Sequence, residues 1–555
     1  MSRGSRHNDA GLDPALVRLS VVVILGAIMS ILDTTIVNVA IDTLAHEFHS
    51  PLSTIQWVST GYLLALSIVI PLSGWSVERF GAKPMWILSL SVFLVGSILS
   101  GAAWSASSLI FFRVIQGIGG GMILPIGTSM MAQAAGPQRI GRVMSILGVP
   151  MLLAPILGPV IGGLIVTSVS WRWIFYVNVP IGIVAIVVAV RMLPTERIDS
   201  KPRLDLLGLL LLSPGLASVV YGLSQLGSSG STSSVAIALS IGVILIAAFA
   251  LHAARRSPGR DGKLRPEPLI DIHLFGDRSF LPAALTSFGF GAALFGALIL
   301  LPLYYQVDRG DSALVAGLLI APQGIGAALV MPSAGRLADR LGPGRIVPIG
   351  LVIVILGTLA YTMVGASTSY AFLAGALFVR GIGFGFTMMP AIAAAYQNLD
   401  HAQVPRATAA INILQRVGGS IGTALLAVIL ERQIAAALPG GGSAVTTGGT
   451  SISPGLREKI APQIASAFGH TFWWAVAIAG LALVPALFLS RKPAAQVSLA
   501  AARAAPVSPG DGFGDGPGDG PGDGPGVAVA AGPGSRRHRK PRHSAAETLN
   551  RSGEN

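Results

Sequence analysis

The sequence places a carboxylate in an apolar run. Residues 19–41 read LSVVVILGAIMSILDTTIVNVAI, and Asp33 is their only ionisable side chain. Burial favours the protonated form of a carboxylate and a nearby cation favours the ionised form, so an acid that alternates between such surroundings can carry a proton. Charged groups inside membranes are costly and mark functional sites. The alternative is a permanently paired acid that orients its helix, with Thr34, Thr35 and Asn38 as hydrogen-bond partners.

Arg113 is a candidate partner for Asp33. Asp33 lies eight residues below the predicted outer end of its span, about 12 Å, and Arg113 lies six residues below the outer end of its own, about 9 Å. Similar depths permit coupling by contact, through water or through Gln116. Arg380 recurs in the second half of the chain, but residues 287–307 (SFGFGAALFGALILLPLYYQV) supply no acid for it. Proton chemistry is therefore assigned to the first half.

The elements that position these residues follow from hydropathy. Of the 555 residues, 52% are hydrophobic and 11% are charged, whereas soluble domains carry about a quarter charged residues. About twenty apolar residues cross a membrane, and this length predicts an all-α polytopic membrane protein. The predicted spans are 18–41, 53–74, 84–104, 107–131, 142–167, 173–193, 204–226, 233–252, 279–305, 313–334, 346–366, 370–396, 407–431 and 471–490.

The charge distribution orients these fourteen spans. A net charge of +13 would fit a nucleic-acid partner, but the basic residues lie in short loops and in a polar tail. With both termini inside, the inner loops hold eighteen Lys and Arg residues and the outer loops hold five, which predicts cytoplasmic termini and no nucleic acid. The absence of cysteine excludes disulfides, thiol catalysis and cysteine-ligated metals.

Two regions lie outside the predicted bundle. Residues 434–470 form a Gly/Ser/Thr-rich outer loop, and the tail after Arg491 carries GDGPGDGPGDGPG, which predicts disorder, followed by SRRHRKPRH. That basic cluster either touches anionic lipids or is simply solvated, and the solvated tail is favoured. The predicted parts are a cytoplasmic N-terminus (1–17), a six-helix bundle (18–193), two inserted helices with a linker (194–278), a second six-helix bundle (279–490) and a cytoplasmic tail (491–555).

The chain contains an internal repeat. GWSVERFGAKP (74–84) between the second and third spans matches GRLADRLGPGR (335–345) between the tenth and eleventh. Two spans after each loop, FFRVIQGIGGG (111–121) matches LFVRGIGFGF (377–386). The chain is therefore interpreted as two copies of a six-helix unit with two helices between them. Such repeats are typical of secondary transporters, whose substrate site lies near the midplane between the halves.

Several motifs together resemble one family. They are the two loops, RVIQGIGGG, GVPMLLAPILGPVIGG (148–163), LDTTIVNVA (32–40) and SWRWIFYVNVPIGI (170–183). In this order they resemble the major facilitator superfamily, more narrowly its fourteen-helix drug:proton antiporter branch, over roughly residues 18–490. The resemblance implies the major facilitator fold of two six-helix bundles plus two inserted helices, alternating access, export coupled to inward proton flow, and proton coupling at Asp33.

The two repeated loops are predicted to form latches that break when the access state switches. Glycines permit tight turns, and the charged residues can contact helix ends. The alternative is a polar loop whose positive charges only set topology. The sequence has Glu78 where the family usually has Asp. The predicted latch residues are Gly74, Glu78, Arg79, Gly81 and Lys83 in the first copy and Gly335, Asp339, Arg340, Gly342 and Arg345 in the second.

Residues 148–163 are predicted to form a kinked and closely packed helix. Prolines kink helices, and a G-x-x-x-G spacing permits close helix approach. In the family that the chain resembles, this pattern is the antiporter signature, and it predicts export. The residues concerned are Gly148, Pro150, Pro155, Gly158, Pro159, Gly162 and Gly163.

The sequence also suggests pocket residues, each of which would equally serve as an interhelical hydrogen bond or an interface aromatic. They are Asn38, Gln56, Trp57, Tyr62, Gln116, Tyr304, Gln306, Asn412 and Gln415. A pocket with one acid and apolar walls suits neutral or weakly cationic hydrophobic molecules.

The leading hypothesis is a plasma-membrane exporter of lipophilic or amphipathic small molecules, driven by protons without a cofactor. The alternatives are a dedicated exporter of an endogenous lipid, siderophore or other metabolite, and a transporter-like sensor or scaffold. An enzyme or ATP-driven pump is disfavoured because neither G-x-x-x-x-G-K-[ST] nor H-E-x-x-H occurs. The nine histidines form no ligand-spaced set within a span, so no metal site is predicted.

Overall fold

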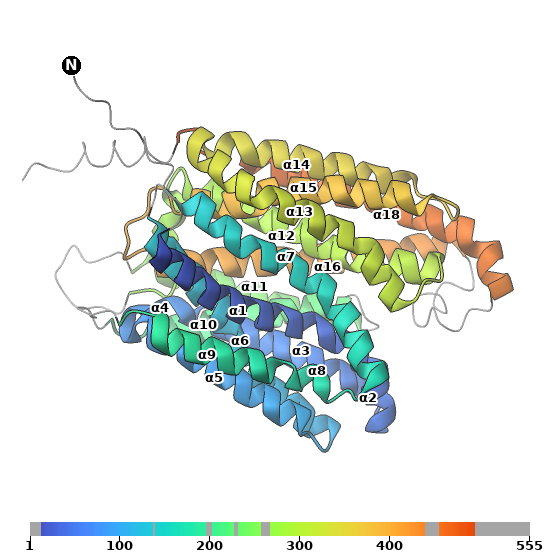
Figure 1. The fold of residues 1–555 in the computed structure, drawn as a ribbon, viewed down its shortest axis with the longest axis horizontal. Helices are drawn as coiled ribbons and strands as arrows, with labels where there is room; N and C mark the ends of the chain where they lie inside the picture. Colours follow the sequence, from blue (N-terminus) through green and yellow to red (C-terminus); the bar gives the residue numbers. More distant parts are fainter. Residues whose placement is uncertain are drawn as a thin grey trace, which may run out of the picture. The chain divides into compact units, whose positions relative to one another are not determined.

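The computed structural model describes residues 13–136, 139–195, 202–226, 231–256, 267–438 and 454–493. Within these ranges every regular element is a helix (Figure 1). Most of the predicted cytoplasmic N-terminus, the middle of the 434–470 loop and nearly all of the predicted tail lie outside the described residues.

The helices of the first half follow the predicted order. They are α1 (Pro14–Ile36), η1 (Val37–Ala40), α2 (Ile41–Glu47), α3 (Leu52–Val69), α4 (Leu72–Phe80), α5 (Ala82–Gly101), α6 (Ala106–Ala135), α7 (Ile140–Ser168), α8 (Trp173–Tyr176) and α9 (Asn178–Met192). The inserted pair follows as α10 (Leu206–Leu226) and α11 (Thr232–Ala254).

The helices of the second half are η2 (Ile272–Gly276), α12 (Phe280–Leu303), η3 (Tyr304–Asp308), α13 (Ala313–Leu341), α14 (Pro343–Leu359), η4 (Ala360–Met363), α15 (Tyr370–Ala395), α16 (Val404–Ala437) and α18 (Pro454–Ala486). Thirteen helical stretches of the described chain are long and apolar enough to cross a membrane, and the bent α7 makes fourteen. The predicted all-α fold with fourteen spans is confirmed.

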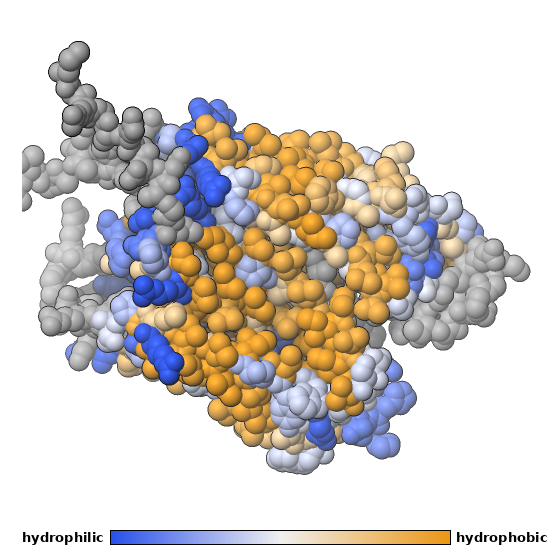
Figure 2. Space-filling model, viewed as in Figure 1, coloured by the Kyte–Doolittle hydropathy of each residue, from blue (hydrophilic) through white to orange (hydrophobic). Residues whose placement is uncertain are grey.

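The surface fits a lipid environment. Figure 2 shows hydrophobic side chains covering the middle of the visible face, with hydrophilic side chains gathered toward both ends. Large apolar side chains such as Ile237, Val243 and Ile244 of α11 are exposed. A helix that is apolar all round is stable in water only when buried, so this exposure places α11 against lipid. The protein is a multi-pass membrane protein.

Several predicted spans differ in length from the helices observed, and two of them show why. The span predicted at 53–74 ends at Val69, and the chain turns at Pro71 into the separate helix α4. The last helix begins at Pro454 rather than at residue 471. The length of an apolar run reflects the thickness of the hydrocarbon core. A helix, however, continues beyond the core wherever its residues favour helix.

Local capping sets the start of the two helices that carry the candidate proton site. The Asp13 carboxylate accepts a hydrogen bond from the backbone N–H of Ala15 at 3.1 Å, with Pro14 at the first helical position of α1. Ser105 and Ser108 form a reciprocal capping box at the start of α6, with the Ser108 N–H 3.1 Å from the Ser105 hydroxyl.

The helices pack in two groups, which are joined by a few helix pairs that run along each other. Helices α1 and α3–α9 pack on one another, as do α12–α18, and α7 runs along α13 between the two groups. The inserted helices α10 and α11 pair with each other, and α10 contacts α3 and α16. Asp205, just before α10, is buried and joins the start of α10 to the end of α11 through His252 at 3.0 Å and Arg256 at 3.1 Å.

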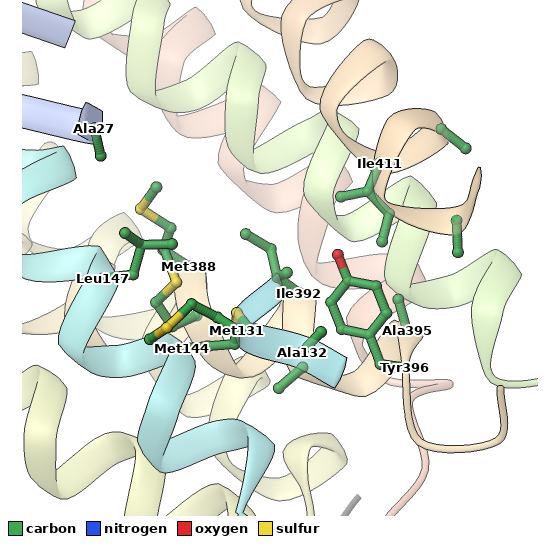
Figure 3. Packing of buried hydrophobic residues seen from close by; sticks show 14 of the residues in the cluster. Ala27, Met131, Ala132, Met144, Leu147, Met388, Ile392, Ala395, Tyr396 and Ile411 are labelled. Atoms are coloured by element: carbon green, nitrogen blue, oxygen red, sulfur yellow. The ribbon is translucent and has the colours of Figure 1, made fainter. Parts of the chain in front are cut away.

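The buried cores are distributed unevenly along the bundle. We call the end that carries Glu78, Lys83, Arg142 and Asp339 the basic end. There the two groups share one core, in which Met131 and Met144 meet Met388 (Figure 3). At the opposite end each group has a separate core. The two halves are therefore closed on each other at the basic end, through flexible methionine side chains that tolerate repacking.

Candidate functional site

Asp33 and Arg113 form a buried ion pair. Asp33 is 0% exposed and Arg113 is 1% exposed, and Nη1 of Arg113 lies 2.5 Å from Oδ2 of Asp33. The pair joins α1 to α6. The predicted similarity in depth is thus confirmed as direct contact, and Gln116 takes part in it as well.

Three polar side chains complete this site. Gln116 accepts from Arg113 at 2.8 Å and donates to Oδ1 of Asp33 at 2.8 Å. Asn178, at the start of α9, donates to the same Oδ1 at 3.1 Å and to Ser97 of α5 at 3.1 Å. We call Asp33, Arg113, Gln116, Asn178 and Ser97 the Asp33 site. Four helices therefore hold one carboxylate.

Arg113 has further partners that fix its orientation. Its Nε donates to the carbonyl of Val58 in α3 at 3.1 Å, and its guanidinium carbon lies 4.0 Å from the ring centroid of Tyr62. A buried ion pair is tolerated only when the remaining hydrogen-bonding groups are also satisfied. Removing one member leaves the other charge buried and unpaired, which costs about 3–5 kcal/mol.

The alternative partners considered for Asp33 bond elsewhere. Thr34 and Thr35 donate to the carbonyls of Ser30 and Leu32 on their own helix, each at 3.0 Å. Asn38 is exposed and accepts from Ser59 at 3.1 Å. Sequence reasoning missed Asn178 and Ser97. The Asn178 side chain lies inside the recognised motif SWRWIFYVNVPIGI, which was the available signal.

The second half presents an arginine without an acid. Arg380 of α15 is 3% exposed and donates to Gln323 at 2.5 Å, to Thr358 at 3.1 Å and to the carbonyl of Ala293 at 3.4 Å. Its guanidinium carbon lies 4.6 Å from the Phe384 ring. Among the described residues it has no carboxylate partner within 4 Å, in line with the sequence prediction.

The first repeated loop contacts the second half. The Glu78 carboxylate pairs with Arg406 of α16 at 2.6 Å and 2.9 Å, and Arg406 also reaches Glu267 at 2.5 Å. A Cβ on Gly74 would stand 3.2 Å from the backbone of Pro405 and Arg406, so glycine allows α4 to approach α16. Burial raises the pKa of Glu78 above its usual range, although Arg406 opposes the shift. The sequence did not single out Arg406 as a latch partner.

The second loop contacts the first half in the same manner. Asp339 accepts hydrogen bonds from the backbone N–H groups of Gly141 at 2.9 Å and Arg142 at 3.0 Å, at the start of α7. This places an acid at a helix N-terminus, where the backbone dipoles favour negative charge. A Cβ on Gly335 would collide with Ser145 and Gly141. Each half therefore contributes an acid that holds the basic end closed.

The remaining latch residues play smaller parts. Gly81 and Gly342 have φ angles of +90° and +87°, so both copies need glycine at the turn. Lys83 donates to the carbonyl of Leu193 at 2.7 Å, which is a contact within the first half. Arg79 is half-buried, and Arg340 and Arg345 are exposed at the same end.

The predicted signature helix is kinked and closely packed. Helix α7 contains Pro150, Pro155 and Pro159 and bends by 41° between Pro155 and Leu157. A Cβ on Gly158 would collide with the Thr35 side chain. A Cβ on Gly162 would stand 2.8 Å from Ile36 of α1, and one on Gly148 would collide with Met389 and Met331 of the second half. A Cβ on Gly163 would meet Val39 at an ordinary contact distance of 4.0 Å.

The suggested pocket residues do not converge. Gln56 and Trp57 are exposed, Trp57 stacking on Tyr221 at 5.7 Å. Tyr304 belongs to the core of the second half, while Gln306, Asn412 and Gln415 are half-buried on other helices. Of these residues only Gln116 belongs to the Asp33 site, and Tyr62 packs against its Arg113. Sequence reasoning also missed Arg416. It is a basic residue inside the span predicted at 407–431, and a search of the spans for charged residues would have found it.

Within the described residues no cluster of three or more His, Asp or Glu side chains could hold a metal ion. The Asp33 site instead gathers a carboxylate, a guanidinium and neutral hydrogen-bonding groups between α1, α5, α6 and α9. Such an arrangement can bind and release a proton when the surroundings of the carboxylate change.

Comparison with known proteins identifies the family. The model of the Major Facilitator Superfamily matches residues 23–423. The multidrug resistance protein B homolog of Mycobacterium tuberculosis H37Rv is 38% identical over 510 residues, covering 88% of this chain and 93% of that protein. The multidrug export protein EmrB of Haemophilus influenzae is 31% identical over 416 residues, covering 74% and 80%.

Solved structures agree on the fold. The proton:xylose symporter XylE, bound to 6-bromo-6-deoxy-D-glucose, superposes with a TM-score of 0.54 at 14% identity, covering 84% of this chain and 94% of that one. This likeness concerns the fold alone. Because the family model matches most of the chain and a relative is 38% identical to it, the chain belongs to the major facilitator superfamily, within its drug:proton antiporter branch.

Proposed function

We propose that this protein is a proton-coupled antiporter that exports lipophilic or amphipathic compounds, drugs among them, by alternating access. The names of its multidrug resistance and export relatives support the substrate class. In the proposal the protein lies in the plasma membrane with the basic end and both termini in the cytoplasm, acts as a transporter rather than an enzyme, and needs the proton gradient but no cofactor.

The observation that carries the proposal is the fully buried carboxylate of Asp33 in contact with Arg113 at 2.5 Å. In this closed arrangement the carboxylate accepts hydrogen bonds from the arginine and from two amide donors. A rearrangement of α1 against α6 would lengthen these contacts, and the carboxylate would then take up a proton. In the proposal, movement of α1 against α6 within the first half thus changes the groups that surround this carboxylate.

In the proposed cycle, the contacts of the two acidic loop residues control access from the basic end. Glu78 with Arg406, and Asp339 with the start of α7, close the basic end. Opening toward the cytoplasm requires both contacts to break. A substrate then enters from that side, and it leaves on the opposite side when the basic end closes again. Proton binding at Asp33 and breakage of the loop contacts are the two events that the cycle links.

The test is substrate-induced proton release from inverted, acid-loaded membrane vesicles, followed with an internal pH dye. We expect a dansyl-labelled amphiphile to release protons with the native chain, and Asp33→Asn to abolish the release. Asp42→Asn is the matched control, because Asp42 is an exposed acid nine residues further along the same span. Equal release by the native and Asp33→Asn proteins would refute the proposed proton site.

A further inference from the structure

The membrane interior of this protein carries an excess of positive charge. Four charged side chains of the described spans lie at least seven residues from either end of their span: Asp33, Arg113, Arg380 and Arg416. These four side chains are three arginines and one aspartate, so two of the positive charges have no acid to compensate them at this depth. Buried charge of this kind requires partners.

The three arginines differ in how they are satisfied. Arg113 is neutralised by Asp33. Arg380 is surrounded by neutral oxygens of Gln323, Thr358 and Ala293. Arg416 has no hydrogen bond or ion pair with any described residue, and its Nη2 is shielded from solvent without an acceptor. A charged donor left without an acceptor inside a protein is costly, so Arg416 is the unsatisfied group.

Arg416 faces the space between the two groups of helices. Gly418 and Gly422 pack closely on Phe288 and Ala292 of α12. Arg416 precedes Gly418 by two residues, so at 3.6 residues per turn it lies on roughly the opposite side of α16. That side is turned toward the first half, with which α16 makes contact through α4 and α6.

Its depth is also that of a substrate site. Arg416 follows the start of α16 by twelve residues, which is about 18 Å at the helical rise and close to the middle of a hydrocarbon core of roughly 30 Å. Secondary transporters bind substrates at this level between their halves. Helix α16 also contacts α6, the helix that carries Arg113 and Gln116 of the Asp33 site.

We propose that Arg416 binds the anionic group of the exported amphiphile, with a carboxylate or a similarly planar oxyanion as the preferred ligand. The guanidinium fork matches two oxygens of such a group. Helices α16 and α6 would contact the apolar body of the ligand. The inference rests on the proposed export function and replaces the neutral or weakly cationic substrates expected from the sequence.

The test compares three probes that share a dansyl group and an eleven-carbon chain. They are 11-(dansylamino)undecanoic acid, its neutral methyl ester and the corresponding quaternary ammonium. Transport by the full chain is measured in proteoliposomes with an imposed pH gradient. Binding to the purified protein in detergent is measured separately by dansyl fluorescence.

We expect the native chain to prefer the carboxylate, and Arg416→Gln to weaken its binding and transport about ten- to a hundredfold, the effect of losing a hydrogen bond to a charged group. The ester should be unaffected. Arg416→Lys should restore part of the preference, since lysine keeps the charge but not the fork. Arg432→Gln, which removes an exposed arginine of the same helix, is the control and should change nothing.

Two outcomes would overturn the inference: an equal loss for all three probes in Arg416→Gln, or preference of the native chain for the quaternary ammonium. Proton coupling is tested separately with the methyl ester, because Asp33→Asn should abolish its proton release while Arg416→Gln leaves it intact. A charge-selective defect in Arg416→Gln alongside normal proton release in Asp33→Asn would refute the proposed coupling and leave the anion site standing.

Discussion

Arg113 and Arg380 are buried arginines on the matching helices α6 and α15 of the two copies of the repeat, yet their surroundings differ. Arg113 meets a carboxylate at 2.5 Å and a tyrosine ring, whereas Arg380 meets an amide oxygen at 2.5 Å and a phenylalanine ring. Both are buried and both orient the helices around them. Each half therefore holds a buried arginine on the corresponding helix, and among the described residues only the one in the first half is paired with an acid.

The two repeated loops make the same kind of contact with different partners. Glu78 finds a side-chain cation on α16, while Asp339 finds backbone N–H groups at the start of α7. The partners differ, but both contacts cross between the halves at the basic end. Closure is thus shared by the two halves, whereas the acid paired with a buried arginine belongs to one of them.

The largest effect is expected from removing each buried arginine in turn. Arg113→Gln strands a buried carboxylate, so we expect a loss of about 3–5 kcal/mol in the free energy of unfolding and loss of substrate-induced proton release. Arg380→Gln removes a cation from neutral acceptors and should cost less and leave proton release intact. Thermal unfolding in detergent and the vesicle assay measure these quantities. Equal effects of the two substitutions would erase the distinction between the halves.

A smaller effect is expected at the loops. Arg406→Gln leaves Glu78 buried without its cation, so it should open the basic end more than Asp339→Asn, which still allows one amide oxygen to accept from α7. The chain has no native cysteine, so spin labels at Phe80→Cys and Leu341→Cys, both exposed positions at this end, report the distance between the halves. A larger opening in Asp339→Asn would contradict the ranking.

The smallest effect concerns pH. Burial raises the pKa of Glu78 above its ordinary value of 4.5, so the closed form binds a proton more tightly than an open form in which Glu78 is solvated. Stabilisation of the closed form is therefore full at acidic pH and is lost as pH rises through the raised pKa. The same spin labels should report a shift toward the open form on alkalinisation, and Glu78→Gln should abolish this dependence. An unchanged response in that variant would assign the titration to another group.

Much of the site was predictable because membranes restrict the sequence strongly. Asp33 and Arg113 could be found as charges inside apolar runs, and their depths could be compared, because a helix advances by a constant rise per residue. Asn178 and Ser97 could not be found in this way, since neutral polar residues are common in spans. The cation for Glu78 was equally hidden, because Arg406 lies more than three hundred residues away.

The sequence by itself determined the number of spans, the repeat and the one acid deep in the bundle. These depend on local hydropathy and helical periodicity. Which groups meet depends on the tertiary structure: Arg113 is neutralised, Arg380 is satisfied by neutral oxygens, and Arg416 has no hydrogen-bond or ion-pair partner among the described residues. Charges at equal depth on different helices either touch or lie apart according to helix rotation and packing, which are set by contacts between distant segments.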